Sequence, residues 1–359
     1  MDAEHLSRIG RLQAALAAAG IDAAFLYTSV NRLYFTGLET SNGLLLVERQ
    51  GTPIFYTDFR YLEVAHRVLN GVEIRKFKPA KEQLAEYASM GQAWRAVGYE
   101  DSLSVDQFLP LQKTFAKAKM VSVTKHIGDI RAVKCAAEID AIRRSAAAND
   151  ALLGDLLTRF RPGMSELEML RQFRIAEAER GLTESFDPII CAGVNAVECH
   201  HQPDASILRP QSELLIDMGV KVDGYCSDMT RTLFFGDPTP RFKEIFGIVL
   251  EANAAVRAAI KPGMRCCDAD KIARDIIAKA GYGDYFGHSL GHSVGLEIHE
   301  QPNLSFRCET VLQPGMVVTD EPGIYIPGDV GVRIEDLLVI TEAGCEVLSH
   351  TPHEIILPC

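Results

Sequence analysis

The sequence predicts an α/β protein with two domains, residues 1–125 and 126–359, the second of which consists of two related halves. Three observations lead to this prediction. Strand-like and helix-like segments alternate up to about residue 125, and a 21-residue segment recurs later in the chain. With 359 residues, 47% of them hydrophobic and 24% charged, the chain is also long enough for two domains.

In the first domain, apolar and polar residues alternate at helical spacing over residues 5–19, and Gly20 ends the pattern. The segments AAFLYTS, GLLLVER and TPIFYTD are predicted strands, separated by Gly, Asn and Pro. The segment IGDIRAVKCAAEIDAIRRS predicts the start of a long helix, and the domain boundary is placed just before it. Other elements are expected as helices at 58–69, 80–89 and 105–117, and as strands at 95–99 and 119–123.

The second domain contains an internal repeat. RPGMSELEMLRQFRIAEAERG at 161–181 resembles KPGMRCCDADKIARDIIAKAG at 261–281, and a helical run precedes each copy. Further on, ECHHQPD at 198–204 corresponds to EIHEQPN at 297–303, and the apolar strands LLIDMG and VVTDEPG follow in turn. Because these matches keep their order, we expect two helix–helix–strand halves about a pseudo-twofold axis. Such an axis would place His200 near His299 and Asp217 near Glu321.

Composition excludes several classes of protein. The formal net charge of −11 disfavours nucleic acid and anionic lipid as partners. The charged N-terminus predicts an amphipathic helix in place of a signal peptide, and no apolar stretch approaches the length of a membrane span. Nine cysteines lie scattered without a repeated CxxC, which favours free thiols in a reducing cytoplasm. We therefore expect a cytoplasmic protein.

One predicted hairpin carries two carboxylates on one face. In LLIDMGVKVDGYCSDMTRTLFF, Asp223-Gly224 is a two-residue turn signal that places Asp217 opposite Thr230. Asp228 then lies diagonally from Asp217 on the same face, because side chains alternate along a strand. Two buried carboxylates repel unless cations compensate them. The hairpin alone fits either a metal site or an outward face wetted by solvent.

Two further segments add candidate ligands. HSLGHSVGLEIHE holds His288, His292 and His299 among glycines, although a single histidine is more often structural. MVVTDEPGIYI places Glu321 at the end of an apolar strand. GVRIEDLLVI places two charged residues on one face of the next strand, Arg333 and Glu335. These two fit either a site or a simple ion pair on an edge strand.

The segments IDMGVKVDGYCSDMTRT, HSLGHSVGLEIHE, TDEPGIYIPG and GVRIED together resemble the pita-bread metallopeptidases, in particular their Xaa-Pro aminopeptidase and prolidase branch. Residues 7–67, with NRLYFTGLETSNG and YTDFRYLEVA, resemble the N-terminal domain of that branch. The resemblance covers nearly the whole chain. It implies an N-terminal creatinase-like α/β domain followed by a C-terminal pita-bread catalytic domain, which is a pseudo-twofold α+β fold.

The resemblance also implies roles for the residues at matching positions. Two metal ions would be held by Asp217, Asp228, His292, Glu321 and Glu335, with Asp228 and Glu335 bridging. His200, His288, His299 and Arg333 would lie beside the metals and act on the substrate or on the ligands, and Glu321 would also move a proton. Three departures from the family pattern, Cys199, His201 and Asp320, remove no ligand but affect the expected shape of the substrate pocket.

The implied activity is hydrolysis of the N-terminal Xaa-Pro bond by a metal-activated water. The oxygen-rich ligand set suits Mn²⁺, and Co²⁺ or Zn²⁺ also fit. The alternatives are an Xaa-Pro dipeptidase (prolidase), another metallohydrolase of the same fold, and a catalytically inactive binding protein. The expected partner is a proline-containing peptide, and the resemblance implies a homodimer. The YTDFRYLEVA segment and the short chain favour the aminopeptidase over the dipeptidase.

Overall fold

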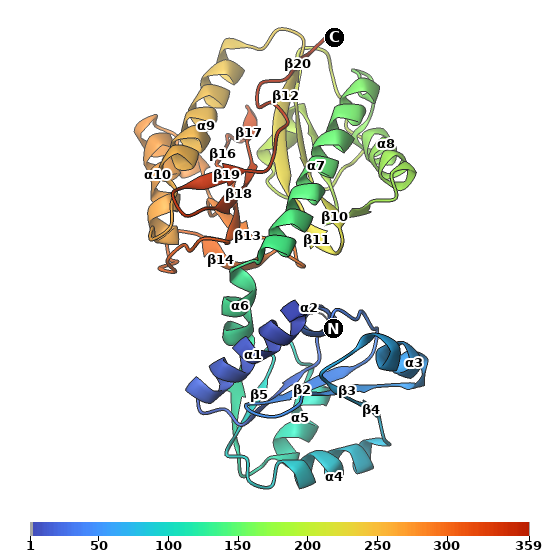
Figure 1. Ribbon diagram of the computed structural model, residues 1–359. Helices are drawn as coiled ribbons and strands as arrows, with labels where there is room; N and C mark the ends of the chain where they lie inside the picture. The colour runs from blue at the N-terminus through green and yellow to red at the C-terminus, as the bar shows by residue number, and fades with distance from the viewer. Residues whose placement is uncertain (1–2, 359) are drawn as a thin grey trace. The chain divides into compact units, whose positions relative to one another are not determined.

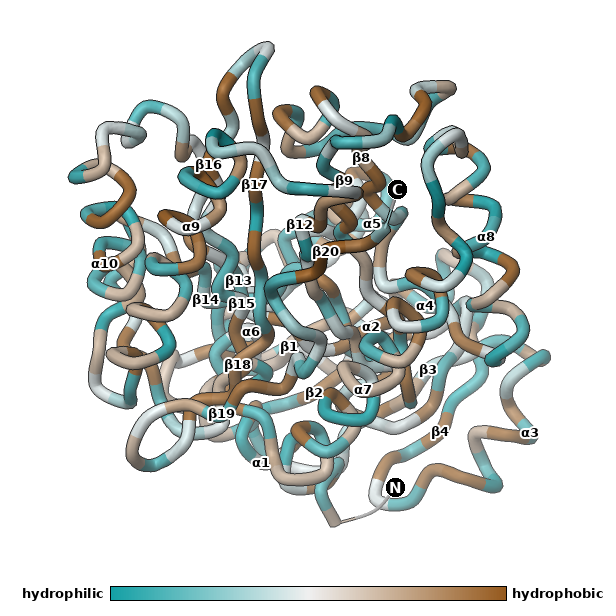
Figure 2. Tube along the Cα trace, turned by 90° about the horizontal axis from the view of Figure 1, so that it is seen from above, coloured by the Kyte–Doolittle hydropathy of each residue, from teal (hydrophilic) through white to brown (hydrophobic). Residues whose placement is uncertain are grey.

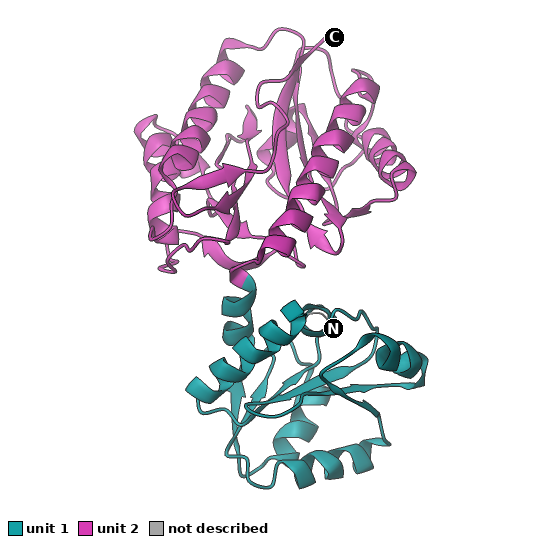
Figure 3. Cartoon of the chain, viewed as in Figure 1, with its two compact units in different colours: residues 1–131 teal, residues 132–359 magenta. Residues whose placement is uncertain are grey.

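The computed structural model describes residues 3–358. The chain divides into two compact units, residues 1–131 and 132–359, each shown in its own colour in Figure 3. The boundary predicted at residue 125 lies within helix α6 (Thr124–Ala132), near the end of the first unit. Within residues 3–358, no helix combines the length and the apolar composition needed to cross a membrane.

The first unit is built on one mixed sheet of six strands in the order β4-β3-β2-β1-β5-β6. The strands β1 and β2, and β2 and β3, pair antiparallel, whereas the remaining neighbours pair parallel. Aromatic and aliphatic side chains of the sheet form a core with those of α4 and α5. The elements of this unit are α1 (Ala3–Ala18), β1 (Ala23–Leu26), α2 (Ser29–Thr36), β2 (Leu44–Glu48), β3 (Ile54–Thr57), α3 (Phe59–Val68), β4 (Glu73–Lys76), α4 (Ala80–Met90), β5 (Ala96–Tyr99), α5 (Val105–Thr114) and β6 (Lys119–Ser122).

Two elements of the first unit have no counterpart in the sequence prediction. The strand β4 reads EIRK and is largely solvent-accessible, so it lacks the apolar alternation that marks a strand. The helix α2 is buried along most of its length and therefore shows no polar face. Its ends are nevertheless well formed, because Thr28 caps the N-terminus and Gly37 closes the C-terminus at φ 73°.

The second unit contains two helix pairs, as the internal repeat predicts. The first pair is α7 (Ala136–Arg159) and α8 (Glu166–Glu179), and the second is α9 (Pro240–Ala259) and α10 (Cys266–Lys279). In both turns the glycine of PGM has a left-handed backbone, with φ 96° at Gly163 and 86° at Gly263. Its amide donates to an equivalent carbonyl, Leu208 in one half and Leu312 in the other. The predicted duplication is confirmed at this level.

Each helix pair packs on the strands of its own half (Figure 1). In the first half, β8 (Ile189–Ala192), β9 (Ser212–Met218) and β12 (Met229–Phe235) pair antiparallel, and β20 (Ile356–Leu357) extends this sheet. In the second half, the sheet order is β14-β13-β15-β18-β19. Figure 2 shows hydrophobic and hydrophilic segments alternating along α8, as expected of a helix with one buried face. The strands of the second half, with the short pair β16 and β17, are β13 (Gly291–Ser293), β14 (Glu300–Leu304), β15 (Val317–Asp320), β16 (Gly323–Tyr325), β17 (Gly331–Arg333), β18 (Asp336–Ile340) and β19 (Cys345–Val347).

The prediction of one long helix from IGDIRAVKC onward is wrong in one respect, because the helix is interrupted between α6 and α7. At the break, Lys134 donates its amide to the carbonyl of Gly315, and Val133 forms a bridge with Met316. These backbone contacts require an extended conformation that a continuous helix would not allow. The partners lie far along the sequence, so local helical spacing carries no sign of them.

Candidate metal centre

All nine residues singled out from the sequence line one cavity of about 420 Å³ in the second unit. Asp217, His292 and Arg333 lie on strands, and the other six lie in segments that connect strands or helices within the two halves. The structure therefore brings together every predicted site residue: Asp217, Asp228, His292, Glu321, Glu335, His200, His288, His299 and Arg333.

The first half contributes two carboxylates through the predicted hairpin. Its turn residues, Asp223 and Gly224, have φ of 51° and 81°, and Val222 pairs with Tyr225. This register places Asp217 on β9 opposite Thr230 on β12, as predicted. Asp228 lies two residues before Thr230, and both carboxylates face the cavity.

The second half contributes a histidine and two glutamates. His292 lies on β13, with its Nε2 3.4 Å from Asp228 Oδ2 and 3.6 Å from Glu321 Oε1. Glu321 directly follows β15. The strands approach so closely here that a Cβ at Gly291 would lie 2.2 Å from the carbonyl oxygen of Thr319. Glycine is required before His292 for this reason.

Glu335 lies between β17 and β18, so the single strand predicted over GVRIEDLLVI is in fact two strands. Its amide donates to the carbonyl of Thr230, and its Oε2 accepts from Thr230 Oγ1 at 2.7 Å. The alternative interpretation proposed an ion pair between Arg333 and Glu335, and the structure does not contain this pair. The guanidinium instead donates to Asp217 Oδ2 at 2.6 Å.

The donor set fits a cation. One ligand atom each from Asp228, His292 and Glu335 lies within 4.8 Å of the others. In addition, Asp217 Oδ1 and Glu335 Oε1 are buried and accept no hydrogen bond within the described chain. Leaving buried carboxylate oxygens without partners is costly, and a divalent ion would satisfy them.

The electrostatics of the cluster lead to the same conclusion. Burial, together with the charges of Glu335 and Asp217, raises the pKa of Asp228 well above its usual value. Burial and the neighbouring Glu321 do the same to the pKa of Glu335. Burial raises the pKa of Glu321 to about 8, an effect that Arg333 opposes and Asp217 reinforces. A bound cation would stabilise the charged forms of these carboxyl groups and so lower their pKa again.

The remaining histidines have distinct surroundings. His288 Nε2 lies 2.9 Å from the hydroxyl of Tyr325, and burial lowers the pKa of His288 to about 4. The ring of His299 meets that of His292 edge-on, with centroids 4.4 Å apart. His200 lines the cavity from the loop after the short helix η1 (Gly193–Val197).

Sequence reasoning missed two hydroxyl groups that organise the centre. Tyr325 accepts from Arg333 Nη1 at 3.0 Å and also contacts His288. Thr230 accepts from Arg333 Nε at 2.9 Å while donating to Glu335. The hairpin register predicts that Thr230 lies opposite Asp217. The sequence does not show that the Thr230 hydroxyl contacts residues more than one hundred positions away.

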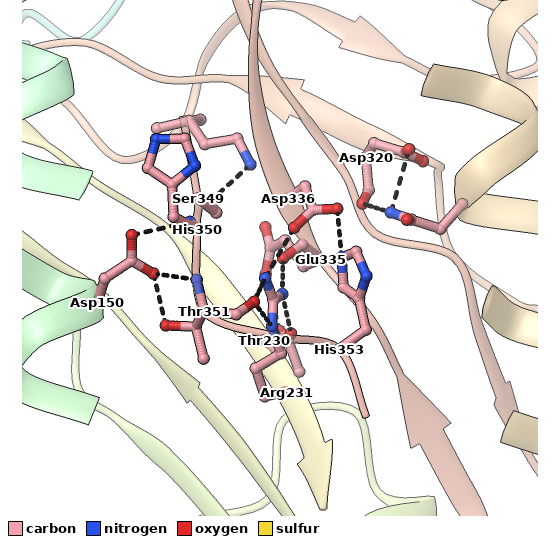
Figure 4. A network of polar contacts seen from close by, with 12 residues as sticks. Asp150, Thr230, Arg231, Asp320, Glu335, Asp336, Ser349, His350, Thr351 and His353 are labelled. Atoms are coloured by element: carbon pink, nitrogen blue, oxygen red, sulfur yellow. Dashed lines mark hydrogen bonds and ion pairs between the residues drawn. The ribbon is translucent and has the colours of Figure 1, made fainter. Parts of the chain in front are cut away.

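A network of polar contacts joins the residues beside the candidate metal centre to the segment near the C-terminus (Figure 4). Asp336, next to Glu335, accepts from Arg231 Nη2 at 2.8 Å and contacts His353 Nε2 at 2.8 Å. Arg231 also donates to the carbonyl oxygens of Glu335 and Thr351. The segment near the C-terminus is thereby attached to β12 and β18, which begin directly after Asp228 and Glu335.

An acidic, histidine-containing cavity of this kind defines a metal-dependent hydrolase. Residues 140–342 match the profile of metallopeptidase family M24, and residues 8–133 match that of the creatinase/prolidase N-terminal domain. The chain belongs to the M24 family and is a peptidase. The match to both profiles confirms the fold predicted from the sequence.

Similar proteins span nearly the whole chain. The peptidase YqhT of Bacillus subtilis is 37% identical over 94% of this chain and 96% of its own. The structure of an Xaa-Pro dipeptidase from Bacillus anthracis superposes with a TM-score of 0.93 at 36% identity, covering 98% of this chain and 99% of that one. An X-Pro aminopeptidase from Thermotoga maritima gives 0.85 at 30% identity, covering 95% and 98%. Both types of enzyme therefore share this architecture.

Proposed function

We propose that this peptidase hydrolyses the bond between an N-terminal residue and a following proline, as an Xaa-Pro aminopeptidase. In this proposal two divalent metal ions are held by Asp217, Asp228, His292, Glu321 and Glu335. The observation that carries it is the meeting of these five residues in one cavity, with oxygens of Asp217 and Glu335 buried and unpaired. Similar proteins named as X-Pro aminopeptidase and Xaa-Pro dipeptidase support the substrate class.

The chemistry of the ligand set favours manganese. Four carboxylates and one histidine form a mainly hard, oxygen-rich site, which suits Mn²⁺, while Co²⁺ and Zn²⁺ are also accommodated by such donors. Held by these residues, a pair of divalent ions would supply Lewis-acid chemistry, lowering the pKa of water and polarising the scissile carbonyl.

The chain's own residues then have separate tasks. Glu321, which lines the cavity next to the other ligands, would accept the proton and return it to the leaving nitrogen. His200 and His299 line the cavity beside the ligands and stabilise the developing oxyanion. His288 is held by Tyr325 and stays uncharged near neutral pH, because burial lowers its pKa to about 4.

Proline at the second position fits this type of catalysis. An Xaa-Pro bond lacks an N–H, so a peptidase that binds its substrate as an added strand loses a hydrogen bond there. Catalysis by direct polarisation of the carbonyl does not need this hydrogen bond.

The aminopeptidase is favoured over the dipeptidase by the charge of the cavity. A dipeptidase recognises a free carboxylate immediately after the scissile bond, which calls for a dedicated cation. Among the described residues, Arg333 is the one Lys or Arg side chain that lines the cavity. Three of its five N–H donors are already used, in bonds to Thr230, Tyr325 and Asp217. The similarity to an Xaa-Pro dipeptidase keeps prolidase activity as the second candidate.

A peptide panel tests the proposal. The chelated protein is reloaded with Mn²⁺, Co²⁺ or Zn²⁺ and assayed with Ala-Pro, Ala-Pro-Ala and Ala-Pro-Ala-Ala at matched concentrations. N-acetyl-Ala-Pro-Ala and Ala-Ala-Ala serve as controls for the free amine and for proline. We expect cleavage of the longer unblocked proline peptides. Cleavage restricted to Ala-Pro would reassign the protein as a prolidase, and cleavage of Ala-Ala-Ala at equal rate would remove the proline requirement.

A further inference from the structure

A buried carboxylate outside the cavity organises the loop that carries His200. Glu166, the first residue of α8, is 0% exposed and contacts four polar groups, all within residues 192–204. Its Oε1 accepts from the amide of Ala192 at 2.7 Å and from Asn195 Nδ2 at 2.9 Å. Its Oε2 accepts from the amide of Asp204 at 2.9 Å and lies 2.7 Å from His201 Nε2. One side chain thus holds the loop at both ends and in the middle.

This loop forms one wall of the proposed active site. Cys199, His200 and Gln202 line the cavity, whereas His201 does not. The imidazole of His201 is only 8% exposed and is directed to Glu166. Because His201 is the next residue after His200, fixing His201 restricts the backbone from which the cavity histidine projects.

The electrostatics of the contact are those of an ion pair. Buried carboxylates are destabilising unless a positive charge or several donors compensate them. Two acidic groups contact His201, Glu166 at Nε2 and Glu198 at Nδ1, the latter at 3.1 Å. Burial disfavours the imidazolium, but the hydrogen bonds to these two groups prevail and raise the pKa of His201 above its usual value.

A metal ion at this place is the alternative, since Glu166, His201 and Asp204 offer ligand atoms within 4.8 Å of one another. Both oxygens of Glu166 are, however, already occupied by protein donors. Asp204 Oδ1 accepts from the amide of Ser206 at 2.6 Å. The contacts therefore describe a closed hydrogen-bonded cluster, in contrast to the metal centre, where carboxylate oxygens are left over.

We propose that Glu166 and His201 are positioning residues, which fix the loop 192–204 so that His200 meets the substrate carbonyl. This inference rests on the proposed function for the task of His200, but the rigidity of the loop is independent of it. Displacing a catalytic histidine by about 1 Å lowers the reaction rate on the order of 10²-fold, so we expect the loss to be in kcat. The metal ligands lie on other segments and should keep their ions.

The first test replaces Glu166 with glutamine, which preserves shape but leaves one acceptor oxygen for four contacts. We expect peptides spanning residues 192–204 to exchange their amide hydrogens about tenfold faster, because bonds to a charged acceptor are lost. Glu168→Gln is the matched control, since Glu168 is an exposed residue of the same helix whose carboxylate accepts hydrogen bonds, within residues 3–358, only from Ser165. Unchanged exchange in Glu166→Gln would overturn the proposal, whether or not the protein cleaves Xaa-Pro peptides.

The second test uses His201→Leu and His201→Gln, assayed for turnover, KM, metal content and melting temperature. We expect His201→Leu to lower kcat by about 10- to 100-fold with metal content and KM close to wild type. His201→Gln keeps an N–H donor for Glu166 and should recover part of this loss. Loss of metal in step with kcat, or equal activity of both variants, would show that the pair acts on overall stability only. If the wild type cleaves no Xaa-Pro peptide, the proposed function fails and the exchange experiment still decides the role of the loop.

Discussion

Arg333 donates from Nη2 to Asp217 Oδ2 at 2.6 Å, and this contact joins two strands that lie 116 residues apart in the sequence. The guanidinium is 3% exposed and faces a cluster of carboxylates. Because it neutralises part of their charge, Arg333 stabilises the site before any metal binds. The burial of its partner Asp217 depends on this pairing.

Replacing Arg333 with glutamine should destabilise the metal-free protein by about 3–5 kcal/mol, because a buried carboxylate loses its partner. The loss should be smaller with metal bound, since divalent cations then supply positive charge to the same carboxylates. Urea unfolding of chelated and loaded protein measures both values. Arg241→Gln is the control, because its ion pair with Asp329 is solvent-exposed and should contribute little to stability. Equal losses in both forms would contradict the charge-balancing role of Arg333.

Removal of the metal should abolish activity and lower the melting temperature. The four carboxylates among the proposed ligands repel one another when no cation is present, so ions bind the folded state preferentially. We expect dialysis against a chelator to inactivate the enzyme and Mn²⁺ to restore both activity and melting temperature. Turnover that persists in protein shown by elemental analysis to be free of metal would exclude the dinuclear site.

Three of the four histidines that line the cavity should divide into two groups. His292 contacts both Asp228 and Glu321, so His292→Ala should reduce metal occupancy. His200 and His299 line the cavity without being proposed ligands, and their alanine variants should lose about 10²–10³-fold in kcat while retaining metal. Elemental analysis and steady-state kinetics on folded variants separate the two effects. Equal loss of metal in all three would refute this division.

The stability of the chelated protein should depend on pH in a particular direction. Burial raises the pKa of Asp228, Glu321 and Glu335, that of Glu321 to about 8. The folded state then binds more protons than the unfolded chain, so the free energy of unfolding falls as pH rises. His288 and His292, whose pKa values burial lowers to about 4, act oppositely, but only up to the unfolded-state value of about 6.5.

Between about pH 6.5 and 8 the carboxyl groups therefore dominate, and we expect the melting temperature of the chelated protein to decrease. The metal-loaded protein serves as the control, because bound cations keep the carboxylates ionised throughout this range. Differential scanning calorimetry in matched buffers records both curves. A melting temperature that rises with pH in the chelated form would show that these groups are ionised without metal.

The site could be predicted from the sequence where local rules apply. The two-residue turn at Asp223 fixes the register of the hairpin, and the register alone places Asp217 and Asp228 on one face. The glycines around His292 are also visible in the sequence, but the close approach of Gly291 to Thr319 was not predicted and comes from the structure. Helix pairs and their PGM turns were recognisable because the chain repeats them.

Features that depend on distant partners could not be predicted in this way. The partner of Arg333 is Asp217 rather than Glu335, because tertiary packing brings β17 to the first hairpin. The helix break after Ala132 comes from pairing with residues 315–316, which helical spacing cannot reveal. Nothing local to Glu166 indicates that it contacts a loop ending nearly forty residues later.

The duplication of the second unit has a consequence for how the protein matures. Asp217 and Asp228 come from the first half, whereas His292, Glu321 and Glu335 come from the second. If these five residues hold the metal ions as proposed, neither half alone contains the full ligand set, and high-affinity metal binding requires both halves to be folded and docked. Metal binding would then be a late step in the maturation of the protein. A fragment containing either half alone should not acquire the ions at the affinity of the whole protein.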